Sequence, residues 1–68
     1  MYTSTYVNSQ GTLRVYAILK TQDKPQLIAE LHGVMADKIW KTYQDVVDAD
    51  FANTDRNPLT YEFEFTTL

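Results

Sequence analysis

One histidine and a set of acidic residues are the side chains of this 68-residue chain that could take part in chemistry. His32 stands two residues after Glu30, so a carboxylate could hold the imidazole as a general base. Such a base also needs a nucleophile or a polarised water. The sequence has no cysteine, no serine elbow and no phosphate-cradling loop, because Gly11 and Gly33 are its only glycines. The pattern favours a polar residue at a strand end and predicts a protein that is not an enzyme.

The acidic residues of the second half suggest a calcium site, but their spacing does not fit one. When the chain from Asp48 onward is aligned with an EF-hand loop, Ala52 replaces a ligand. Asn53 replaces the glycine of that loop, and Leu59 replaces its bidentate glutamate. The sequence therefore predicts neither a metal ion nor a cofactor.

Charge is distributed unevenly along the chain, which has a net charge of −3. Residues 1–44 carry five Lys or Arg and three Asp or Glu, whereas residues 45–68 carry one Arg and six acids. An acidic half argues against direct binding to nucleic acid, because the phosphate backbone attracts a basic stripe. It favours a partner protein with a basic surface, such as a complex that handles nucleic acid, or a merely solvated face.

Length and composition predict one small domain over residues 1–68. A chain of this size buries only about 60% of the surface that its unfolded form exposes, so self-association would add stability. The longest apolar run, Val15 to Leu19, is far shorter than the roughly 20 residues of a membrane helix. No basic residue precedes Arg14 to begin a signal peptide. We therefore expect a cytoplasmic protein that does not bind membranes.

One amphipathic helix and four strands must position these residues. Residues 34–52 have helical periodicity, with Ala36, Ile39, Tyr43 and Val47 on one stripe. Alternating apolar and polar residues predict strands over residues 2–7, 12–20, 26–32 and 59–67. The fold is therefore expected to be α+β, a four-stranded, mainly antiparallel sheet (β-β-β-α-β) with the amphipathic helix packed on one face. The last strand is expected beside the first.

Local signals add details to this expected fold. Gly11, in a polar turn after the first strand, is free to take a positive φ. The regular helix is expected to end near Asp48 to Asp50, with Phe51 folded back onto the core. The alternation assigns the following residues to the inner face of the sheet: Leu13, Val15, Ala17, Leu19, Leu27, Ala29, Leu31, Tyr61, Phe63 and Phe65.

The outer face of the sheet is expected to be unusually apolar, because Tyr16, Ile18 and Ile28 alternate onto it and one helix cannot cover both faces. Its charged residues are spaced so that they could pair across strands: Arg14, Lys20, Glu30, Glu62 and Glu64.

Three functions remain open. The favoured one is a small acidic protein-binding module, of the kind with which phages and mobile elements block a host complex stoichiometrically. Its candidate contact residues are Tyr16, Ile18 and Ile28 on the outer face, Trp40 on the helix, and Asp45, Asp48 and Asp55 at the acidic helix end and loop. The second is a homodimer or larger homo-oligomer that self-assembles through the outer face. The third is an enzyme that uses His32 with Glu30.

Overall fold

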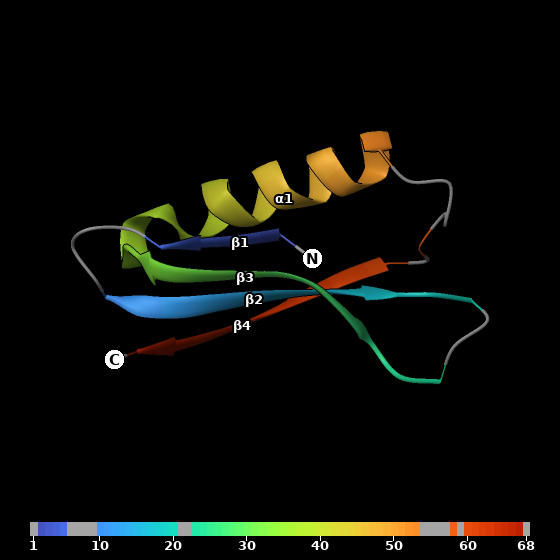
Figure 1. Ribbon diagram of the computed structural model, residues 1–68, viewed down its shortest axis with the longest axis horizontal. Helices are drawn as coiled ribbons and strands as arrows, with labels where there is room; N and C mark the ends of the chain where they lie inside the picture. Colours follow the sequence, from blue (N-terminus) through green and yellow to red (C-terminus); the bar gives the residue numbers. More distant parts are fainter. Residues whose placement is uncertain (1, 6–9, 21–22, 54–57, 59, 68) are drawn as a thin grey trace.

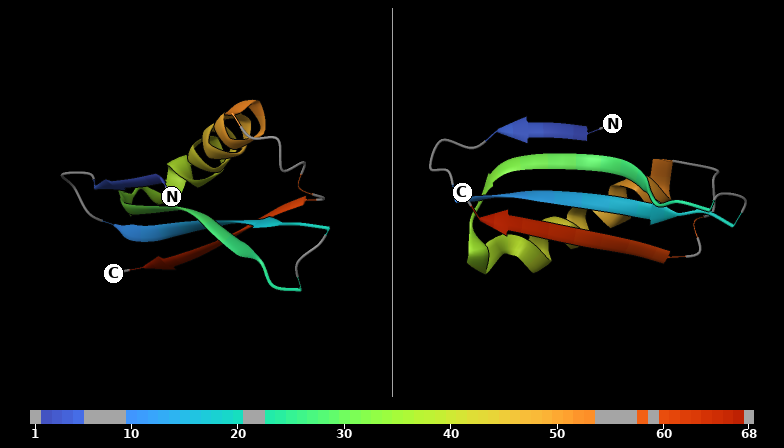
Figure 2. Two further views of the ribbon diagram at one scale, coloured as in Figure 1. Left: turned by 45° about the vertical axis from the view of Figure 1, so that its right-hand side comes forward. Right: turned by 90° about the horizontal axis from the view of Figure 1, so that it is seen from below.

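The computed structural model describes residues 2–5, 10–20, 23–53, 58 and 60–67. Its elements in chain order are β1 (Tyr2–Thr5), β2 (Gly11–Ile18), β3 (Gln26–Val34), the 3-10 turn η1 (Ala36–Lys38), α1 (Ile39–Asn53) and β4 (Thr60–Thr67). Helix α1 lies along one face of the sheet, and no described element covers the opposite face (Figures 1 and 2). The expected α+β class with a single α-helix is confirmed. We call the uncovered side the open face.

The strands lie in the order β1-β3-β2-β4. Strand β2 is antiparallel to both β3 and β4, whereas β1 runs parallel to β3. The prediction that the last strand pairs with the first was wrong. Strand β1 occupies the far side of β3, and the strand that follows α1 pairs with β2 at the opposite edge of the sheet (Figure 2).

The core lies between the sheet and α1. Along β2, Leu13, Val15 and Ala17 are fully buried, as their alternation predicts. The apolar side of α1 packs against them through Ile39 and Tyr43 and, one turn later, through two valines. Further residues that were predicted on the inner face and that pack in this cluster are Ala29, Leu31, Tyr61, Phe63 and Phe65.

Strand β3 contains a register shift that strict alternation does not predict. Val15 pairs with Ala29, but the next residue, Tyr16, pairs with Leu27, so Ile28 is an extra residue in β3. Ile28 is only 8% exposed and belongs to the core, whereas Leu27 is half-buried opposite Tyr16. The predictions that Ile28 lies on the outer face and Leu27 on the inner face were therefore wrong.

The same shift turns Gln26 toward the helix-covered face, opposite the buried Ala17. The side-chain Oε1 of Gln26 is buried and accepts no hydrogen bond within the described part of the chain. An unsatisfied buried acceptor costs roughly 1–3 kcal/mol, so this end of β3 is a weak point of the core.

The two glycines have different structural roles. Gly33 is the extra residue of a second register shift and has a φ of 85°, which favours glycine. Gly11 is the first residue of β2 and does not use the freedom to take a positive φ, since Gly33 alone has one among the described glycines. A Cβ on Gly11 would overlap the ring of Phe65 and lie 2.7 Å from the carbonyl oxygen of Thr66. Close packing against β4 therefore requires glycine at position 11.

The helix differs from its predicted range at both ends. Val34 belongs to β3, and the regular helix begins only at Ile39. At the other end α1 continues through Phe51, which stays helical and is 65% exposed, so the prediction that this ring folds back was wrong. The hydroxyl of Tyr61 donates to Oδ2 of Asp50 at 2.7 Å, which gives this half-buried carboxylate a partner. The helix can therefore pass through Asp50 with a hydrogen-bond donor for its carboxylate.

Candidate protein-binding surfaces

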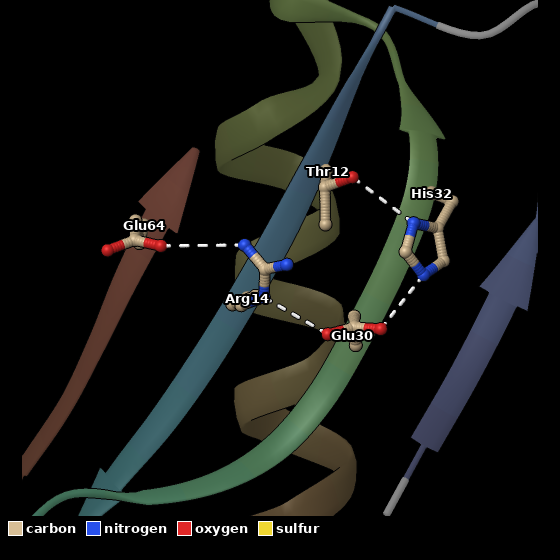
Figure 3. A network of polar contacts seen from close by, with 5 residues as sticks. All are labelled: Thr12, Arg14, Glu30, His32 and Glu64. Carbon is tan, nitrogen blue, oxygen red and sulfur yellow. Dashed lines mark hydrogen bonds and ion pairs between the residues drawn. The ribbon is translucent and has the colours of Figure 1, made fainter. Parts of the chain in front are cut away.

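A network of polar side chains crosses the open face from β4 to β3 (Figure 3). Arg14 lies directly opposite Glu30 on one side and Glu64 on the other. Its Nε is 3.0 Å from Oε2 of Glu30, and its Nη1 is 3.5 Å from Oε1 of Glu64. The prediction that charged residues of this face pair across strands is confirmed for these three.

His32 extends the network toward the end of β3. Its Nε2 is 2.9 Å from Oε1 of Glu30, and its Nδ1 is 3.1 Å from Oγ1 of Thr12. An ionised carboxylate only accepts, so Nε2–H is the donor, and in the neutral ring Nδ1 accepts from the Thr12 hydroxyl. The hydrogen bond from Arg14, and next that from His32, hold the pKa of Glu30 below its ordinary value of 4.5.

The order hydroxyl, imidazole, carboxylate is also the order of nucleophile, base and orienting acid in serine-type hydrolases. Here Thr12 is only 6% exposed, which leaves its hydroxyl little access to a substrate. The carboxylate is shared with Arg14 rather than reserved for the imidazole. Sequence reasoning overlooked Thr12; the antiparallel register that sets it opposite His32 is the signal that would have found it. Within the described residues no three metal-ligating side chains come together.

The apolar part of the open face differs from the prediction in one residue. Tyr16 and Ile18 lie on this face and are half-buried, with Leu27 in the place expected for Ile28. We call Tyr16, Ile18 and Leu27 the open-face patch.

A second apolar region lies where α1 passes over β4. Trp40 is 71% exposed, yet its ring makes edge-to-face contacts with Phe63 at 5.2 Å and Tyr43 at 6.2 Å between centroids. The rings of Tyr43 and Phe63 are 5.0 Å apart, and the Tyr43 hydroxyl donates to the carbonyl oxygen of Tyr61 at 3.1 Å. The indole is therefore held in place by the helix and by β4 while most of its surface faces solvent.

The exposed aromatic rings of α1 share one side of the helix. Phe51 follows Trp40 by three turns, so the helical repeat directs both side chains to nearly the same side. In the described part of the sheet, β4 pairs with β2 alone, and its other edge has no neighbouring strand (Figure 2). We call Trp40, Phe63 and the free edge of β4 the β4 surface.

The predicted acidic contact residues are engaged locally. Oδ2 of Asp45 lies 3.0 Å from Nζ of Lys41, and both side chains are well exposed. Asp48 accepts a hydrogen bond of 2.8 Å from Gln44. Exposed pairs of this kind contribute little stability. Asp55 lies outside the described residues. The structure thus distributes the candidate residues over the open face, α1 and its acidic side.

None of the described helices is long and apolar enough to cross a membrane. The chain matches no known protein family, no curated protein and no solved structure.

Proposed function

We propose that this protein is a small, acidic, non-catalytic module that binds another protein through the β4 surface. The observation that carries the proposal is the 71% exposure of Trp40, whose ring is nevertheless fixed against Phe63 and Tyr43. A ring that is already positioned loses little side-chain freedom on binding, and tryptophan is enriched among the residues that dominate interfaces. Phe51 adds a second exposed ring on the same side of α1.

Charge supports a basic partner. Asp45, Asp48 and Glu62 are exposed, and residues 45–68 carry six acids and one Arg. Opposite charge steers association and sets the orientation of a complex. We therefore assign the protein a stoichiometric role in the cytoplasm, as an inhibitor or adaptor of a basic complex such as one that handles nucleic acid. Proteins of phages and mobile elements are the type that this role fits.

Self-assembly through the open-face patch is the second candidate. Tyr16, Ile18 and Leu27 are apolar and only half-buried on a face that no described element covers. If this patch joins copies of the chain, Ile18→Lys should convert an oligomer into a monomer, because a charge would be buried in the contact. A monomeric wild-type protein at high concentration would exclude this candidate.

The proposed function is tested by affinity capture from a lysate of the source's host cells, with the wild-type chain, Trp40→Ala and Tyr16→Ala as baits. We expect the wild type to retain one partner stoichiometrically. Trp40→Ala should weaken that complex by at least about 30-fold, the effect of a hot-spot residue. Tyr16→Ala, an aromatic truncation on the open face, serves as the matched control and should retain the partner. Equal capture by Trp40→Ala and wild type would overturn the proposal.

A further inference from the structure

We infer that β4 accepts an extended segment of the partner protein as a fifth strand, and that this segment alternates basic with apolar residues. The inference rests on the proposed function and specifies its partner. It follows from the juxtaposition of a free strand edge, a row of glutamates on the open side of that strand and an exposed tryptophan on its helix side.

β4 is a long and regular edge strand. It pairs with β2 through all eight of its residues, Thr60 to Thr67, without a register shift. An antiparallel strand directs the N–H and C=O groups of alternate residues away from its neighbour, so a free edge offers a row of donors and acceptors. Proline, bulges and charged side chains, lysine above all, are the usual means of blocking such an edge. β4 has no proline, lysine or bulge, and its only charged residues are Glu62 and Glu64, which repel acidic segments but attract basic ones. The opposite edge strand, β1, has only four residues.

The open side of β4 carries more negative charge than the sheet neutralises. Glu62 is exposed and makes no hydrogen bond or ion pair with another described residue. Glu64 is 60% exposed and shares Arg14 with Glu30. One guanidinium therefore serves two carboxylates, while the third has no cation among the residues that the structure describes. A strand added beside β4 would place residues directly opposite Glu62 and Glu64, where a positive charge stabilises the pair.

The helix side of β4 calls for apolar residues in the same segment. Phe63 and Phe65 pack toward α1 and remain partly exposed, and Trp40 stands against Phe63. Side chains alternate between the two faces along a strand. A segment whose lysines or arginines lie opposite the glutamates therefore directs its intervening residues toward the aromatic side. The two sides of β4 together specify an alternation of basic and apolar residues.

A second copy of β4 fits this edge less well than a basic segment. In an antiparallel pair related by a twofold axis, residues of the same face lie opposite each other. The register centred on Phe63 sets Glu62 against Glu64 of the copy, and the register centred on Glu64 sets that residue against itself. Like charges in this position are destabilising. Registers that avoid the contact overlap only part of the strand.

The test uses the full chain and a synthetic peptide, as long as β4, in which lysine alternates with valine. Binding is followed by the emission of Trp40, the only tryptophan, and by backbone amide NMR. We expect saturable binding, a blue shift of the emission and perturbed amide resonances along β4. A matched peptide with glutamate in place of lysine should bind at least about tenfold more weakly, because it sets like charges opposite each other at two positions.

Two controls separate strand addition from simple charge attraction. The first control uses two lysine–valine peptides, one N-methylated on its lysines and the other on its valines. The peptide that keeps the N–H groups facing β4 should bind, and the peptide that loses them should not. The second control changes the charge on β4. Glu62→Lys should weaken binding of the lysine peptide by about threefold or more, and the affinity of Glu62→Gln for this peptide should lie between those of Glu62→Lys and the wild type.

Three results would overturn the inference: no binding of the lysine peptide, equal affinities for the lysine and glutamate peptides, or resonance changes that map to the open-face patch or β1 instead of β4. Failure of the peptide test while capture still depends on Trp40 would remove strand addition and leave the proposed function standing. Loss of Trp40 dependence in the capture experiment would remove the proposed function itself.

Discussion

The two faces of the sheet are stabilised by different kinds of interaction. The helix-covered face is stabilised by apolar packing, since Leu13, Val15 and Leu31 are almost completely buried in the core cluster that includes residues of α1. The open face is held by charge and hydrogen bonds, with Arg14 between two carboxylates and His32 bonded to one of them. The covered face should therefore respond to changes of shape, and the open face to changes of protonation.

At β4, neither apolar packing nor charge pairing is complete. Trp40 has packing partners on one side only, and Glu62 has no cation among the described residues. The edge of β4 likewise has no neighbouring strand in the described sheet. Groups that are well satisfied stabilise a fold, whereas groups left open at one place are available to a partner. This contrast is the reason for placing the binding function at β4 rather than on the open-face patch.

The largest expected effect is a change of shape on the covered face. Gly11→Ala should lower the free energy of unfolding by about 1–3 kcal/mol, because the added methyl group would overlap the Phe65 ring. Chemical denaturation measures this loss. In a Phe65→Ala background the same substitution should cost less, since the ring no longer occupies the space. Equal costs in both backgrounds would show that Phe65 does not lie over Gly11.

A smaller effect of opposite sign is expected at the register shift. Gln26→Met keeps the length of the side chain and removes the buried oxygen that lacks a donor, so the protein should gain about 1 kcal/mol. Gln44→Met, on the exposed side of α1, is the control and should change stability little. A destabilised Gln26→Met would mean that Gln26 does not turn inward and that Leu27 does not join the open-face patch.

The smallest effect is a pH dependence that belongs to the open face. Because Arg14 and His32 hold the pKa of Glu30 below 4.5 in the folded protein, ionised Glu30 stabilises the fold above that pH. This contribution is lost as the pH falls below 4.5 through the folded-state pKa. Glu30→Gln should therefore be less stable than wild type at neutral pH, and the difference should shrink in acid. Urea midpoints measured from neutral pH to well below 4.5 would reveal a constant difference if this account were wrong.

The α+β class and most of the core could be predicted because burial imposes a period on the sequence. Leu13, Val15 and Ala17 alternate as a half-buried strand does, and Ile39 and Tyr43 recur at helical spacing. Pairing between Arg14 and its neighbouring glutamates followed from the same alternation.

The errors arose where non-local contacts override local pattern. One extra residue in β3 places Ile28 on the covered face and Leu27 on the open face, the reverse of the prediction. Both side chains are apolar, so their types do not indicate a bulge. The partner of β4 depended on the position of β1, which pairs with β3 in parallel. Phe51 remained helical because Tyr61, from a distant strand, satisfies the neighbouring Asp50. Trp40 was placed correctly on the helix, but its contact with Phe63 required the strand order.

Site-specific photocrosslinking tests the central claim most directly. The chain contains no cysteine, so Gln44→Cys, one turn after Trp40, and Leu27→Cys, on the open-face patch, can each carry a single photoactivatable label. Both labelled proteins would be irradiated in the lysate used for affinity capture. Our account predicts a single crosslinked partner from Gln44→Cys and none from Leu27→Cys. Crosslinking from Leu27→Cys alone would contradict it and assign the contact to the open face.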